Sequence, residues 1–388
     1  MSSIKDLFLL DPDIHFLNHG SFGATPRAVF EAYQEWQRLL ERQPVLFLGR
    51  EYARLHHEAR CALGEYLNAR AEDLVFVPNA THGVNIVARS LNLGAGDEVL
   101  ATDHEYGACD RTWDFLCRKR GASYIRQPIP LPVSSQDEIL ERFWEGVTHR
   151  TKVIFLSHIS SPTALRFPVK EICRRARLAG IRTLIDGAHA PGQIPVDLAS
   201  IRADFYAGNC HKWMMSPKGA GFLHARQEVQ GMVEPLVVSW GYDAEEDFST
   251  GSAYVDYLQW TGTRDPAAAL SVPAAIQFME ENRWEEIRLG CAELLRTALH
   301  RIEQVTGLPP LYPDDRDLFL QMAVAQLPTG TDLKELKTRL YDEFQVEVPL
   351  IEWNGFKLIR ISVQGYNTQE DADALVAGLA RLLPEVTA

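Results

Sequence analysis

Short runs of residues that favour strands alternate along the chain with longer segments in which apolar residues recur at helical spacing. No internal repeat or low-complexity stretch interrupts this order. The alternation is typical of a mostly parallel sheet with helices on its faces. We predict strands at residues 74–77, 98–101, 152–157, 182–185 and 204–207.

Two helices can be delimited by the residues at their ends. Thr25 and Pro26 are expected to begin the first, because a capping hydroxyl followed by proline is a favoured helix start, and Pro44 is expected to end it. The second is predicted at residues 169–179, closed by Gly180, between two of the strands. In the first helix, the apolar residues at helical spacing are Val29, Tyr33, Trp36, Leu39 and Leu40.

A passage rich in glycine and proline at residues 262–273 separates this alternation from a C-terminal part with helix, strand and helix patterns. We therefore predict an α/β protein with three parts. Residues 1–20 form an N-terminal arm that contributes to the small domain and the active site. Residues 21–265 form a large domain, and residues 266–388 form a small domain.

Composition narrows the class of protein. The chain has 39 Lys and Arg against 52 Asp and Glu, a formal charge of −13, which disfavours nucleic-acid binding through a basic face. No segment approaches the roughly 18 apolar residues that a membrane span needs. The six cysteines are far apart without a C-x-x-C pair, and the first residues do not resemble a signal peptide, so we expect reduced thiols and a cytoplasmic location.

Polar residues gather just beyond each predicted strand. In open α/β sheets the ligand binds outside the carboxyl ends of the strands, so these clusters are expected to converge on one site. They lie at residues 79–83, 103–106, 157–161, 186–189 and 209–212.

Together the five clusters supply hydroxyls and amides at a helix start, an aromatic ring, a carboxylate and a lysine. Pyridoxal 5'-phosphate needs these groups: its phosphate favours a helix amino terminus, its ring nitrogen an acidic partner and its aldehyde a lysine amine. The sequence therefore indicates this cofactor, and no metal.

Two motifs make a family resemblance specific. Asp186-Gly-Ala-His189 and Asn209-Cys-His211-Lys212, with 26 residues from Asp186 to Lys212, resemble the class V aminotransferase family. This family has the aspartate-aminotransferase-like fold (fold type I), with a large, mostly parallel sheet of the seven-stranded type and a smaller α+β domain. Residues 16–23 (FLNHGSFG) and 260–266 (WTGTRDP) are most similar to its isopenicillin N epimerase branch.

The resemblance implies roles for four catalytic residues. Lys212 would carry the cofactor and, once freed, act as the general base at the substrate Cα. Asp186 would keep the ring nitrogen protonated. His189 stands where this family places a side chain that binds the phenolic oxygen, and Tyr106 where a ring stacks on the cofactor face; His104 fits that position less well.

The resemblance also implies how the phosphate is held. Thr81 and the amide of His82 would bind it at a helix start, with help from Asn209 and His211. Thr263 resembles the residue that reaches the phosphate from the neighbouring subunit. A homodimer is therefore expected.

On the substrate side, Arg360 resembles the arginine that binds the α-carboxylate, a task that suits a bidentate guanidinium. Asn18, Gly20, Ser21 and Phe22 are expected to line the pocket there. Ser161 occupies a position where desulfurases usually carry Asn. Residues 346–353 lie where desulfurases present a cysteine and contain none, which disfavours transfer through a protein persulfide.

The predicted activity is that of a cofactor-dependent enzyme acting at Cα of an amino acid, resembling amino-acid epimerisation. A C–S β-lyase, like cysteine or cystine lyases and enzymes of the ergothioneine pathway, is the alternative, and an aminotransferase is the third choice. The sequence identifies neither the substrate side chain nor a second proton donor.

Other residues carry weaker expectations. Trp213, Phe22 and the Trp240–Tyr242 stretch suggest an aromatic-walled entrance. Arg264 either meets a distal carboxylate of the substrate or pairs with Asp265. The pair His56-His57, with Cys61 on the same helical stretch, lacks a closed set of metal ligands, so a solvated helix face is favoured.

Overall fold

Alternating apolar residues along the strands form the buried core of the molecule. The structure is a computed structural model that describes residues 4–244 and 249–388 of the 388-residue chain. In β2, Val75 and Val77 join one buried cluster while Leu74 and Phe76 join another. The sheet is therefore apolar on both faces, as expected for strands covered by helices on each side.

The large sheet has seven strands in the order β2-β8-β7-β6-β5-β3-β4, and all neighbours are parallel except the two pairs that β8 makes. This confirms the predicted α/β fold with a mostly parallel seven-stranded sheet. The strands are β2 (Leu74–Val77), β3 (Glu98–Thr102), β4 (Ser123–Gln127), β5 (Thr151–Ser157), β6 (Arg182–Gly187), β7 (Phe205–Asn209) and β8 (Gly221–Ala225).

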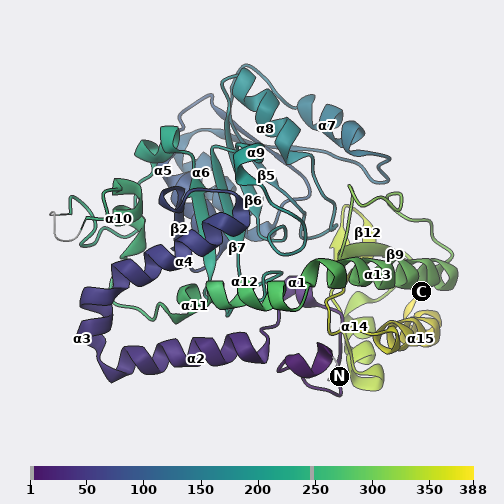
Figure 1. The fold of residues 1–388 in the computed structure, drawn as a ribbon. Helices are drawn as coiled ribbons and strands as arrows, with labels where there is room; N and C mark the ends of the chain where they lie inside the picture. The colour runs from purple at the N-terminus through teal and green to yellow at the C-terminus, as the bar shows by residue number, and fades with distance from the viewer. Residues whose placement is uncertain (1–3, 245–248) are drawn as a thin grey trace.

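Helices cover both faces of this sheet (Figure 1). The long helix α4 passes in front of the sheet, and α11 and α12 pack against α2 and α4. The helices of this part are α2 (Arg27–Arg42), α3 (Pro44–Leu46), α4 (Tyr52–Leu67), α5 (Ala80–Ser90), α6 (Gly107–Arg120), α7 (Gln136–Trp144), α8 (Val169–Leu178), α9 (Leu198–Ile201), α10 (Ala253–Gln259), α11 (Ala267–Leu270) and α12 (Val272–Glu281). Short 3₁₀ turns lie at Ile4–Leu7, Ala71–Asp73 and Gln227–Met232, and a π turn at Phe47–Glu51.

The C-terminal part has its own antiparallel sheet in the order β11-β12-β9. Both ends of the described chain lie beside this part, next to α14 and α15 (Figure 1). Its elements are α13 (Trp284–Thr306), β9 (Met322–Leu327), α14 (Leu333–Phe344), β10 (Val346–Glu347), β11 (Leu350–Trp353), β12 (Phe356–Ser362) and α15 (Gln369–Val386). The division at residue 266 remains a prediction.

The N-terminal arm joins the small sheet region to the large one. Strand β1 (His15–Phe16) pairs in parallel with β10, and the short helix α1 (His19–Phe22) follows it. Gly23, at a φ of +70°, then passes so close to the chain around Lys212 that a Cβ there would lie 2.1 Å from the carbonyl oxygen of His211. Only glycine fits such an approach.

The prediction for the first helix was wrong at its start. Helix α2 begins at Arg27 without a side-chain cap, and the hydroxyl of Thr25 donates instead to the backbone oxygen of Ser216 at 3.3 Å. Helix α2 ends at Arg42, with Gln43 as its cap directly before Pro44, and Pro44 also begins the short helix α3. The second helix is confirmed as α8, with Gly180 just beyond it at positive φ.

Two further observations bear on the class of protein. All six cysteines are free thiols. Within residues 4–244 and 249–388, no helix is both long and apolar enough to cross a membrane.

Candidate active site

A pocket of about 210 Å³ lies at the carboxyl ends of the parallel strands. All five polar clusters contribute to its wall, for example with Thr81, Tyr106, Ser161, Asp186 and Lys212. The sheet register explains this, because Ser157 of β5 pairs with Asp186 of β6, and Gly187 with Gly208 of β7. Ser21 and Phe22 of α1, directly after the arm, complete the wall.

Lys212 follows β7, and its Nζ lies 3.2 Å from Nε2 of His189. Burial, together with the positive charge of Arg360, lowers the pKa of Lys212 to about 8, while Asp186 acts in the opposite direction. The amine is consequently closer to its neutral, nucleophilic form near neutral pH than an exposed lysine is.

Asp186 is buried near the end of β6. Its Oδ1 accepts a hydrogen bond from the amide of Ala188 at 2.9 Å, and its Oδ2 accepts one from the thiol of Cys109 at 3.5 Å. Burial raises the pKa of Asp186, and no cationic side chain lies within 4 Å of it in the described parts of the chain. A buried carboxylate in this state favours a cationic partner.

His189 is held between two side chains. The indole Nε1 of Trp213 donates to its Nδ1 at 3.3 Å, and its Nε2 faces Lys212. Burial and the positive charges of Lys212 and Arg360 hold the pKa of His189 well below its ordinary value, so the ring is neutral.

Two backbone amides at the start of α5 already donate hydrogen bonds to side chains of the protein. The side chain of Asn79 accepts a hydrogen bond from the amide of His82 at 2.9 Å, and that of Asn209 accepts one from the amide of Ala80 at 2.8 Å. The predicted use of the His82 amide for a phosphate competes with the first of these bonds. Thr81 and Asn209 both lie on the pocket wall.

His211 also lies on the pocket wall, with Nδ1 3.2 Å from the carbonyl oxygen of Ala220. Burial lowers the pKa of this imidazole to about 4. A bound anion next to it would raise that pKa, because an opposite charge favours the protonated ring.

Arg360 comes from β12 and is almost fully buried behind the pocket. Its Nη1 donates to the backbone oxygen of Ser161 at 2.6 Å and to the Ser161 hydroxyl at 3.2 Å, and its Nη2 donates to the hydroxyl of Ser21 at 3.0 Å. No carboxylate of the described residues pairs with it, and its Nε has no hydrogen-bond partner there. Among the described residues, Arg360 is therefore not part of an ion pair that serves only the fold.

The arm supports Arg360 from behind. Ser21 donates its hydroxyl to Asn18 at 2.6 Å, and the Asn18 amide donates to Glu347 at 2.9 Å. Gly20 packs so closely on the small sheet that a Cβ would lie 2.7 Å from the sulfur of Met322. Asn18 and Gly20 thus lie behind the wall that Ser21 forms, rather than on it as predicted.

The aromatic entrance is only partly as predicted. Phe22 is 72% exposed at the pocket and Tyr106 is 45% exposed on its wall, so Tyr106 is not a core residue. Trp213, by contrast, is completely buried, because its ring packs on His19 with the ring centres 4.9 Å apart. The expectation that Trp213 lines the entrance was therefore wrong.

Three other residues lie away from the pocket. His104 is buried against Trp353. Arg264 donates to the backbone oxygen of Gln259 at 3.2 Å and does not pair with Asp265. Thr263 is exposed and does not line the pocket of its own chain. Within the described residues, no group of three or more His, Cys, Asp or Glu side chains is arranged to hold a metal ion.

Two residues without a predicted role support the site. His19 binds the backbone oxygen of Lys212 through Nε2 at 3.0 Å and the hydroxyl of Tyr366 through Nδ1 at 2.9 Å. Glu105 accepts hydrogen bonds from the amide and hydroxyl of Ser157, and burial raises its pKa to about 8. The only indication of these two residues in the sequence was that His19 lies in residues 16–23 and Glu105 in the polar cluster at residues 103–106.

Known proteins resemble this chain in sequence and in fold. The family model Aminotransferase class-V matches residues 21–375. "Isopenicillin N epimerase" of Amycolatopsis lactamdurans is 36% identical over 98% of this chain and 98% of its own. "Probable L-cysteine desulfhydrase, chloroplastic" of Arabidopsis thaliana is 29% identical over 96% of this chain and 84% of its own. The apo structure of a cysteine desulfurase from Thermococcus onnurineus superposes with a TM-score of 0.83 at 20% identity, covering 99% of both chains, and shares the fold.

Proposed function

Because the chain belongs to the class-V aminotransferase family and is therefore an enzyme that uses pyridoxal 5'-phosphate, we propose that it epimerises an amino-acid substrate at Cα. The observation that carries this proposal is the 36% identity to an isopenicillin N epimerase over nearly the full length of both chains. The pocket supports it, since Lys212 lies on its wall and the buried Arg360 donates hydrogen bonds to Ser161 and Ser21, which also line it.

The residues present fit the cofactor. Asp186 is a buried carboxylate without a cationic partner among the described residues, as a protonated ring nitrogen requires. Lys212 has a depressed pKa, as an amine that must react with an aldehyde requires. We assign the phosphate to Thr81 at the start of α5, to Asn209 and His211 at and just beyond the end of β7, and to Thr263 of a second copy.

The chain's own residues would then handle one proton and one carboxylate. The bound cofactor supplies an electron sink that makes the substrate Cα–H acidic. Lys212, as the neutral amine beside His189, would take that proton from one face of Cα, and inversion then requires a proton from solvent water to reach the opposite face. Arg360 holds the substrate carboxylate so that the Cα–H points at Lys212, and its existing contacts to Ser161 and Ser21 fix the guanidinium plane.

The second candidate is a C–S β-lyase, which the similarity to an L-cysteine desulfhydrase favours. Such an enzyme shares the proton abstraction at Lys212 and differs in the loss of a β-substituent. No cysteine lines the pocket, so the product would leave as a free thiol or persulfide rather than on the protein. An aminotransferase is the third choice.

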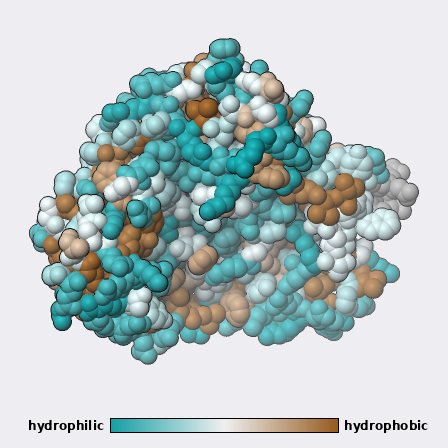
Figure 2. Space-filling model, turned by 180° about the vertical axis from the view of Figure 1, so that it is seen from behind, coloured by the Kyte–Doolittle hydropathy of each residue, from teal (hydrophilic) through white to brown (hydrophobic). Residues whose placement is uncertain are grey.

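We further propose a homodimer and a cytoplasmic location. The dimer is supported by a pocket that is open around Phe22 in one chain and by several exposed apolar side chains in residues 236–242, such as Val238 and Trp240. Figure 2 shows apolar side chains at the edge of the molecule that carries α10. The six free thiols support a reducing compartment.

Complementation between two inactive variants tests the shared site. Co-expressed Lys212→Ala and Thr263→Val chains should regain activity, up to about a quarter of wild type, because half of the sites in each mixed dimer are intact. Failure to regain activity, with dimers present by sedimentation, would contradict a role of Thr263 in the site of the neighbouring chain.

The reaction is tested by incubating the holoenzyme with a panel of amino acids and analysing the products by chiral mass spectrometry. Epimerisation predicts the inverted enantiomer without pyruvate or ammonia. A lyase predicts pyruvate, ammonia and a sulfur product, and an aminotransferase predicts a 2-oxo acid.

A further inference from the structure

Trp213, which directly follows Lys212 in the chain, contacts the imidazole of His189. Trp213 is completely buried, and its Nε1 lies 3.3 Å from Nδ1 of His189. An indole nitrogen can only donate a hydrogen bond, so Nδ1 of His189 must be the acceptor. In a neutral imidazole the proton must then be on Nε2, the nitrogen that faces Lys212 at 3.2 Å.

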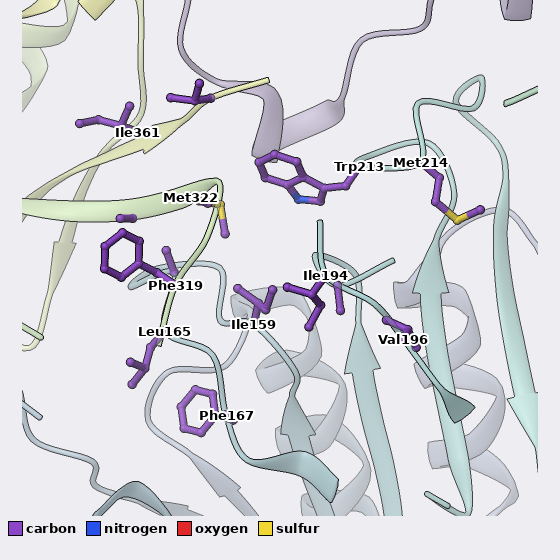
Figure 3. Close-up of a cluster of buried hydrophobic side chains, with 14 of the residues drawn as sticks. Ile159, Leu165, Phe167, Ile194, Val196, Trp213, Met214, Phe319, Met322 and Ile361 are labelled. Atoms are coloured by element: carbon purple, nitrogen blue, oxygen red, sulfur yellow. The ribbon is translucent and has the colours of Figure 1, made fainter. Parts of the chain in front are cut away.

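The packing around Trp213 leaves the indole little freedom to turn. Its ring lies against the ring of His19, and its backbone passes so close to Gly192 that a Cβ on that glycine would lie 2.2 Å from the carbonyl carbon of Trp213. Figure 3 shows the indole within the buried cluster that also contains Ile194 and Met322. The direction of the N–H is therefore set by the fold rather than by solvent.

We propose that Trp213 is a positioning residue whose indole N–H keeps the proton of His189 on Nε2, so that His189 presents a hydrogen-bond donor to the amine of Lys212. A lysine that accepts a hydrogen bond must use its lone pair, and only the neutral amine has one. Trp213 thus favours the neutral, reactive amine of Lys212, and it does so through His189, which lies between the two residues. The inference rests on the proposed attachment of the cofactor at Lys212, but not on the reaction that follows.

Other groups also affect the pKa values of His189 and Lys212, and a substitution of Trp213 would leave these groups in place. The fully buried His189 ring is neutral because burial opposes its charge, and burial together with the positive charge of Arg360 opposes protonation of Lys212. The charged or titratable groups that act on the pair are Arg360 from β12, Asp186 from β6, Cys109 from α6, His19 from α1 and His211 from the loop after β7.

The variant Trp213→Phe removes the donor and keeps an aromatic ring. His189 can then carry its proton on Nδ1 and accept from a protonated Lys212, so the pKa of Lys212 should rise. The measurement is the rate at which the cofactor-free full-length chain takes up pyridoxal 5'-phosphate, followed by absorbance as a function of pH. In this uptake the amine replaces the aldehyde oxygen, and one water is released.

We expect the midpoint of the uptake profile to move to higher pH by at least about half a unit, which slows uptake at pH 7 about threefold. The matched control is Trp113→Phe, because Trp113 is equally buried, its Nε1 has no partner within the described residues, and it lies outside the pocket. That variant should keep the wild-type midpoint. In a His189→Asn background, Trp213→Phe should cause no further shift.

A second measurement is made on the wild-type chain, and a variant serves only to assign the resonances. Long-range ¹H–¹⁵N spectra of the wild-type chain should show His189 with a bare Nδ1 and a protonated Nε2, assigned by comparison with His189→Asn. A proton on Nδ1, or an unchanged uptake midpoint in a folded Trp213→Phe chain, would overturn the role of Trp213. If Lys212→Ala still retained the cofactor covalently after borohydride treatment, the proposed attachment itself would fail instead.

Discussion

The Nη2 of Arg360 lies 3.0 Å from the hydroxyl oxygen of Ser21, a contact that spans 339 residues of sequence. It joins the N-terminal arm to the central strand of the small sheet at the edge of the pocket. Ser21 can accept this bond because it donates its own proton to Asn18. The arm thereby orients the only buried guanidinium that contacts residues of the pocket wall in the described chain.

The variant Arg360→Lys tests the role of this guanidinium. An ammonium cannot bind a carboxylate in the bidentate manner, so we expect kcat/KM to fall by about 10- to 100-fold, mainly through a higher KM. Steady-state kinetics check this. Arg174→Lys is the control, because Arg174 pairs with Glu171 on the exposed face of α8. Equal KM values for the two variants would contradict the assignment.

Lys212→Ala should abolish both turnover and covalent retention of the cofactor. The physical reason is the loss of the one lysine amine that the described residues place on the pocket wall. Borohydride treatment followed by peptide mass spectrometry locates the attached group. Lys218→Ala, six residues further on and exposed, should retain cofactor and activity. Residual turnover close to wild type in Lys212→Ala would defeat the mechanism.

Asp186→Asn should lower the rate of Cα hydrogen exchange by on the order of 100-fold or more. An amide cannot hold a proton on the ring nitrogen, and truncating one partner of a buried charged pair costs about 2–5 kcal/mol. Cys109→Ala removes only a weak thiol donor from Asp186, at 3.5 Å, and should cost less than about threefold. Similar losses in both variants would point to a general packing defect rather than to the charge.

The depressed pKa of Lys212 predicts a pH-dependent cost in stability. Burial lowers it from 10.5 to about 8, so between these pH values the unfolded chain binds more protons than the folded chain does. The contribution of Lys212 to stability therefore increases as pH rises through this window. We expect cofactor-free Lys212→Met to melt above the wild-type chain at pH 7, with a difference that shrinks between pH 8 and 10.5. Calorimetry of both chains checks this, and a constant difference across the window would refute it.

The sequence predicted most strands of the seven-stranded sheet but not all. Strand β2 was predicted with the observed bounds, since its four residues are all apolar and buried. Strand β4 was missed, because it lies at the sheet edge and its Ser, Arg and Gln side chains do not alternate cleanly with apolar ones. Strand β8 was missed because no helix separates it from β7. The two strands are antiparallel, so the loop that carries Lys212 can connect them without a crossover helix.

The part of the site that lies at the carboxyl ends of the strands could be predicted from the sequence. The five polar clusters meet there because each follows a strand of the same sheet, a relationship that alternating patterns reveal. Contacts between distant segments could not be predicted in this way. His19 binds Tyr366 from 347 residues away, and Trp213 turns inward because it packs on that same His19.

The most direct test of the central claim is the fate of the Cα hydrogen. The holoenzyme is incubated in deuterated water with single enantiomers of candidate amino acids, and substrate is recovered for chiral mass spectrometry. The account predicts one deuterium at Cα together with inversion, without pyruvate, ammonia or a 2-oxo acid, and loss of both effects in Lys212→Ala. Release of pyruvate and a sulfur product without an inverted enantiomer would contradict it.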